Sequence, residues 1–147
     1  MRTSGIVAAS VVLLLFSAPI RADLKRALAE PNLERRSGLA LDNALDALKR
    51  ARAAYDRGET EDLTTLTAEI LASADLASAS LAQSGKNPRR SDWYKKAEIK
   101  TRDLARRLED FQQQMSYADR ALLDKVKARV QQIHEELLIG VMEGKKK

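Results

Sequence analysis

Residues 93–141 read WYKKAEIKTRDLARRLEDFQQQMSYADRALLDKVKARVQQIHEELLIGV and contain the longest unbroken helical periodicity of the chain. Apolar side chains recur there at steps of three and four residues, in two runs separated by residues 116–119. This spacing is typical of bundle and coiled-coil seams, and it predicts two long helices that face each other as a hairpin. The two runs are Ala97, Thr101, Leu104, Leu108, Phe111 and Met115, then Leu123, Val126, Val130, Ile133 and Leu137.

The break between the two runs predicts a tight turn over residues 115–119. Ser116 is expected to cap the amides of the second helix, with Asp119 in the place that Glu usually takes in a capping box. The second helix is then expected over residues 117–143. A single hairpin leaves apolar surface uncovered on both helices, so the rest of the chain must supply partners.

The remaining sequence has the composition of further helices. Of the 147 residues, 4% are aromatic and 32% charged, and three prolines and six glycines interrupt the chain, which indicates an all-α domain. Apolar faces predict one helix over residues 33–57 and another that follows Gly58 and ends near residue 84. These faces are Leu41, Leu45, Leu48, Ala51 and Tyr55, then Leu63, Leu66, Ile70, Ala74, Ala77 and Leu81.

Four helices of about 24 residues would each be about 36 Å long. Matched lengths and short connections predict an antiparallel up-down-up-down four-helix bundle built from two helical hairpins. Gly38 weakens the first helix by up to about 1 kcal/mol relative to Ala, unless close packing there needs the missing side chain. Helical repeats are the rival architecture, but no period of about 34 residues returns.

Residues 1–22 have the features of a secretory signal peptide. Arg2 precedes an apolar run over residues 6–18, and Pro19 and then Ile-Arg-Ala follow at 20–22, which predicts cleavage after Ala22. An uncleaved membrane anchor is the alternative, but the run is shorter than the roughly 20 residues that cross a bilayer. We therefore expect an exported, periplasmic protein without a transmembrane span in its mature chain.

The predicted organisation is a signal peptide at 1–22, a short N-terminal segment at 23–32, a four-helix bundle at 33–143 and a basic tail at 144–147. The sequence contains no cysteine, so the mature chain is neither lipid-anchored through cysteine nor held by disulfides. Loss of Arg2 and Arg21 lowers the formal charge from +5 to +3. This excess is too small to indicate a nucleic-acid partner.

His134 is the only histidine of the chain. The predicted bundle is similar in size to the periplasmic b-type cytochromes, which hold haem with a Met of the first helix and a His of the last. Here the first helix has no Met, and Met115 and Met142 lie on later segments, so that ligand pattern does not transfer. Gln131 and Leu138 break the two metal-binding spacings around His134. We predict no catalytic residue, metal or cofactor, and a half-exposed His134.

The most distinctive surface feature is a cationic cluster with aromatic residues interleaved, where the two hairpins are joined. Such a cluster fits an anionic partner, whether an acidic envelope polymer, phospholipid head groups or an acidic protein patch. The alternative is a solvated connection in which Trp93 closes the open end of the core. The predicted binding residues are Lys86, Arg89, Arg90, Trp93, Tyr94, Lys95 and Lys96.

These observations predict a non-catalytic exported helical binding or scaffold protein of the cell envelope, with a protein or an anionic envelope component as its partner. A periplasmic chaperone or stress adaptor is one alternative, and a cofactor-binding redox bundle that uses His134 is another. Ala and Ser residues at 72–82 predict a surface that a neighbouring helix approaches closely. Together with Leu71 and Leu76, this face is also a candidate surface for a homo-oligomer.

Overall fold

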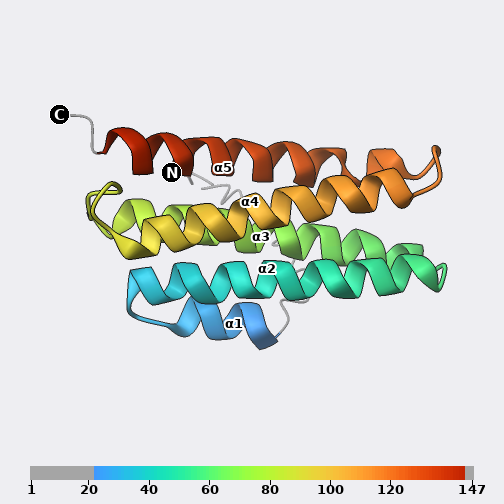
Figure 1. The fold of residues 1–147 in the computed structure, drawn as a ribbon. Coiled ribbons are helices and arrows are strands. Elements are labelled where there is room, and N and C mark those ends of the chain that lie inside the picture. Colours follow the sequence, from blue (N-terminus) through green and yellow to red (C-terminus); the bar gives the residue numbers. More distant parts are fainter. Residues whose placement is uncertain (1–21, 145–147) are drawn as a thin grey trace, which may run out of the picture.

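The computed structural model describes residues 22–144, which form helices joined by short connections (Figure 1). No strand occurs in this part of the chain, so the prediction of an all-helical protein is confirmed. The four long helices pack against each other, as predicted. The predicted signal peptide lies outside the described residues except for Ala22, and residues 145–147 of the basic tail also lie outside them. The helices are α1 (Ala22–Ala29), α2 (Leu33–Asp56), α3 (Thr60–Gln83), α4 (Asp92–Gln114), the 3-10 helix η1 (Arg120–Leu123) and α5 (Asp124–Glu143).

Consecutive long helices run in opposite directions, and α2 with α3 and α4 with α5 form two hairpins (Figure 1). Between the hairpins, α2 packs along α4 and α3 packs along α5, whereas α3 and α4 contact each other little. Residues 84–91 therefore cross the end of the bundle diagonally. As a result the neighbours α2 and α4 run in the same direction, and their N-termini lie at the same end of the molecule (Figure 1).

The apolar faces that the periodicity marks form the core. Every predicted seam residue of α3, α4, η1 and α5 is buried, and of the predicted face of α2 only Leu45 and Tyr55 are half-buried. Helix α2 also buries four alanines beyond those predicted, and with α3 it forms the most extensive helix pair of the described chain. Small side chains on both helices allow this close approach. The additional alanines are Ala40, Ala44, Ala47 and Ala54.

The predicted capping box after α4 is wrong. The Ser116 hydroxyl donates to Asp119 Oδ2 at 2.7 Å, and the Tyr55 hydroxyl donates to the same oxygen at 3.1 Å. The Ser116 amide in turn donates to the Tyr55 hydroxyl at 2.8 Å. Because these contacts hold residues 116–119 in a turn that is tied to α2, the helix does not begin at residue 117. It begins with η1 at Arg120 and becomes α-helical at Asp124.

The short helix α1 lies against α2 and α3 and buries Leu24 and Ala27. The turn that follows ends at Asn32, whose side chain accepts from the Arg35 amide at 2.9 Å and caps α2. Ser91 caps α4, by accepting from the Tyr94 amide at 3.4 Å. Within residues 22–144, no helix combines the length and the apolar character that crossing a bilayer requires.

Candidate functional site

Trp93, at the start of α4, lies against the backbone of α2 at Gly38. A Cβ atom built on Gly38 would be only 3.0 Å from Cζ3 of the Trp93 ring. The ammonium of Lys96 lies 5.2 Å from the centroid of the ring, within the range of a cation–π contact. The half-buried ring is therefore positioned by α2 and by a cation one turn along its own helix.

Two open hollows flank this ring, and Trp93 and Lys96 line both of them. The first, of about 390 Å³, lies at the junction of α2 with the connection between the hairpins, and is also lined by Glu34, Lys86 and Arg90. The second, of about 480 Å³, lies where α1, α2 and α4 meet. We call the two together the Trp93 groove. Its second hollow is lined, besides Trp93 and Lys96, by Arg26, Glu30, Arg35, Gly38, Leu39, Asp42 and Lys100.

The Trp93 groove has an excess of positive charge, because six basic and four acidic side chains are among its lining residues. Arg35, Lys86 and Arg90 form no ion pair among residues 24–144, the part of the chain whose side chains the structure describes. Lys100 does pair with Asp42, at 2.6 Å between Nζ and Oδ1. The N-termini of α2 and α4 also lie at this end (Figure 1), and the positive ends of two helix dipoles therefore reinforce the attraction for anions.

The structure brings together four of the seven predicted binding residues, namely Lys86, Arg90, Trp93 and Lys96. The other three do not line the groove. The Tyr94 hydroxyl donates to the Leu81 carbonyl at 3.0 Å, and burial raises the pKa of Tyr94. Lys95 pairs with Asp92 at 3.9 Å. The Cβ of Arg89 lies 3.4 Å from a Cβ built on Gly144, so its stem follows the end of α5.

Sequence reasoning missed Arg26 and Arg35, which line the same groove from α1 and from the first turns of α2. They are separated from Trp93 by more than fifty positions and carry no motif. What places them at the site is the packing of α1 and α4 on the same helix, α2. The predicted cluster came from residues 86–96 alone. With Arg26 and Arg35 it comes from three segments of the chain, namely α1, the start of α2, and residues 86–96.

His134 is partly buried at the edge between α4 and α5, as predicted. Its Nε2 atom lies 3.1 Å from Oε1 of Glu98, and Nε of Arg102 lies 3.7 Å from the same oxygen. Of the two methionines considered beside His134 as haem ligands, Met142 is 68% exposed near the C-terminus of α5, and Met115 is buried just after the C-terminus of α4. Among residues 22–144, no group of three or more His, Asp or Glu side chains is arranged to hold a metal ion.

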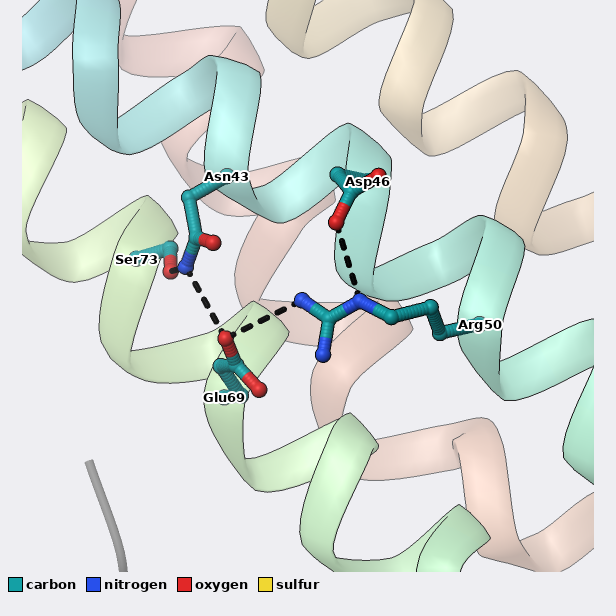
Figure 2. A network of polar contacts seen from close by, with 5 residues as sticks. All are labelled: Asn43, Asp46, Arg50, Glu69 and Ser73. Carbon is teal, nitrogen blue, oxygen red and sulfur yellow. Dashed lines mark hydrogen bonds and ion pairs between the residues drawn. The ribbon is translucent and has the colours of Figure 1, made fainter. Parts of the chain in front are cut away.

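A second polar cluster, buried between α2 and α3, was not predicted (Figure 2). Asn43 Nδ2 donates to Glu69 Oε1 at 3.2 Å and to Ser73 Oγ at 2.9 Å. Arg50 Nη2 donates to the same Glu69 oxygen at 3.2 Å, and its Nε donates to Asp46 at 2.9 Å. Buried polar groups need such partners. Because the partners come from two helices, the cluster fixes α2 and α3 in one register.

Protein-family models, curated proteins and solved structures all fail to match this chain. The function is therefore inferred from the chemistry of the described residues. In the cluster between α2 and α3, Asn43, Glu69 and Ser73 are buried and already bonded to one another or to Arg50, whereas the Trp93 groove is open to solvent. Cations, an aromatic ring and two helix N-termini converge at the groove, which can therefore hold negative charge.

Proposed function

We propose that this protein is a non-catalytic, exported binding protein of the cell envelope, and that it holds an anionic partner in the Trp93 groove. The observation that carries the proposal is the convergence of Arg35, Lys86, Arg90 and Lys96 on one aromatic ring. Single surface cations contribute little to binding, but a cluster that lacks ion pairs gives a field that attracts anions.

The competing interpretation is a solvated connection whose Trp93 only closes the core. Trp93 does pack against the core cluster, which both interpretations require. The binding interpretation has the further support that its cations come from separate segments. Arg35 belongs to α2, Lys86 and Arg90 to the connection and Lys96 to α4, and all of them line hollows on the two sides of the same ring.

The test removes two of these cations and compares the result with a matched control. Lys86→Gln with Arg90→Gln should abolish salt-sensitive binding to immobilised polyanions or to anionic vesicles. Lys49→Gln with Lys125→Gln removes the same charge from exposed positions away from the groove and should leave binding unchanged. Unchanged binding of the first variant, or an equal loss in both, would remove the proposal.

Export needs its own test, because the proposed setting depends on it. Cell fractionation and N-terminal sequencing of the protein expressed from the full sequence should find an envelope protein that begins at residue 23. Accumulation in the cytosol with residues 1–22 intact would contradict the exported role.

A periplasmic chaperone or stress adaptor is the second candidate. It is favoured by Ile139 and Met142, which are 52% and 68% exposed on α5. They lie within one turn of Gly140, whose position contacts Pro88 of the basic connection. Apolar and cationic side chains at one end can hold unfolded clients. Purified protein that fails to suppress the aggregation of a denatured client would exclude this role.

A further inference from the structure

We propose that the anionic partner is a linear polyanion, a polymer chain with a carboxylate or phosphate on each repeat, lying lengthwise in the Trp93 groove. This inference rests on the proposed function and specifies its ligand. The two hollows adjoin at Trp93 and Lys96, which line both of them, and we call the pair, along the seam between α2 and α4, a trough. A trough fits a chain better than it fits a single small ion.

The dimensions of the trough suit several charged units. Its lining residues run from Glu34 to Asp42 on α2 and from Asp92 to Lys100 on α4. Eight residues of helix correspond to about 12 Å on each wall. Lys86 and Arg90 lie at one end, Lys96 lies at the middle, and Arg26 and Arg35 line the other hollow. Neither hollow contains all of these cations, so a chain that occupies both hollows contacts more of them than a small anion in one hollow does.

The trough also has a defined end. Beyond Arg26, a third hollow of about 210 Å³ continues along α2 and shares Arg26, Leu39 and Asp42 with the second. Its other lining residues, Asn43 and Asp46, add a carboxylate and no cation. Asp46 is paired with Arg50 and Asp42 with Lys100, so this hollow offers a polyanion no cation beyond Arg26. The structure thus favours a chain that enters at Lys86 and Arg90 and passes Trp93 as far as Arg26.

A bilayer surface is a poorer match for this site. The cations line the inside of a concave trough, which a flat surface cannot enter. The exposed apolar side chains Ile139 and Met142, which would insert into a membrane interface, are on α5. That helix packs along α3 and α4 rather than along α2, so its apolar face is not part of the groove.

The experiment measures how binding depends on ligand length, with Trp93 fluorescence as the readout because Trp93 is the only tryptophan. The probes are inorganic triphosphate, long-chain polyphosphate, and short and long uronic-acid polymers, which separate phosphate from carboxylate. All proteins are expressed from the full 147-residue sequence. We expect the long chains to bind about tenfold more tightly per phosphate or carboxylate than the short ones, because they release more counterions.

Two pairs of substitutions locate the chain in the trough. Arg26→Gln with Arg35→Gln should remove the advantage of the long chains, lower the salt slope of their binding by about one to two units, and leave triphosphate binding unchanged. Lys86→Gln with Arg90→Gln should weaken short and long chains alike. The Lys49→Gln and Lys125→Gln pair is again the control.

The outcomes separate this inference from the proposed function. If the Arg26 and Arg35 pair binds long chains as the wild type does, the trough is not the site, although a loss in the Lys86 and Arg90 pair would still support anion binding. Binding to anionic vesicles but to no soluble chain would identify a bilayer partner and overturn the inference. Binding to polyglutamate alone would point to an acidic protein and overturn it as well. No binding to any anion would remove both proposals.

Discussion

Replacing Gly38 with Ala tests the contact that positions Trp93. Within a helix, Ala is more favourable than Gly by about 1 kcal/mol, so the substitution alone would raise the free energy of unfolding. In the structure, however, the added Cβ would lie 3.0 Å from the Trp93 ring. Relieving such a contact costs roughly 1–3 kcal/mol. We therefore expect Gly38→Ala to lower the free energy of unfolding by an amount between zero and about 2 kcal/mol.

A double-mutant cycle isolates the contact from the helix propensity. In a Trp93→Ala background the added methyl group meets no ring, so Gly38→Ala should stabilise the protein by about 1 kcal/mol. The coupling between the two positions is then roughly 1–3 kcal/mol. The loss of stability that Trp93→Ala causes by itself cancels in the cycle.

Urea unfolding of the four proteins, followed by far-ultraviolet circular dichroism, gives the required free energies. Trp93 emission in the single Gly38→Ala variant reports in addition whether the ring has moved toward solvent. Equal stabilisation by Gly38→Ala in both backgrounds would show that the ring does not rest on Gly38. Trp93 would then not pack on α2 in the middle of the groove.

Three further changes test other parts of the structure. Asn43→Ala should lower the free energy of unfolding by roughly 1–3 kcal/mol, because it removes two hydrogen bonds between buried side chains; an unchanged urea midpoint would contradict this. Tyr55→Phe removes a hydroxyl bonded to two groups of the turn after α4 and should cost about 0.5–1.5 kcal/mol in the same assay. The hydrogen bond from Arg106 lowers the pKa of Asp103 from its ordinary value of 3.8. Since the folded pKa is the lower one, the carboxylate stabilises the protein above pH 3.8 and loses this effect as pH falls through the folded pKa. The stability difference between the wild type and Asp103→Asn should therefore shrink in acid, and a difference independent of pH would refute the ion pair.

Large apolar side chains were enough to predict most of the core. Leu104, Val130 and their neighbours at helical spacing are buried, because a bundle leaves no other place for an unbroken apolar stripe. Alanine carries less information. Ala44 is fully buried and Ala53 is exposed on the same helix, and the sequence shows no difference between them. The extent of the contact between α2 and α3 was therefore only partly predictable.

The buried cluster of Asn43, Glu69 and Ser73 shows why polar positions are harder to assign. In an amphipathic pattern such residues are attributed to the solvated face, and each taken alone would be costly to bury. They become compatible with the interior only as a set. Whether the set forms depends on the register between two helices, which periodicity within each helix does not define. The conformation of the turn at residues 116–119 could not be predicted for the same reason, because Tyr55, the side chain that holds it, is distant in the sequence.

The candidate site depends on a feature of the fold that helix lengths and directions leave open. In a bundle whose consecutive helices are all neighbours, the first and third helices lie diagonally opposite, and Gly38 would be far from Trp93. Here the diagonal connection at residues 84–91 makes α2 and α4 neighbours. The one sequence signal for this arrangement was Gly38 itself, a costly residue inside a helix unless something packs against it. The Trp93 ring does so, and the same contact gives the connection's cations and Arg35 a common groove.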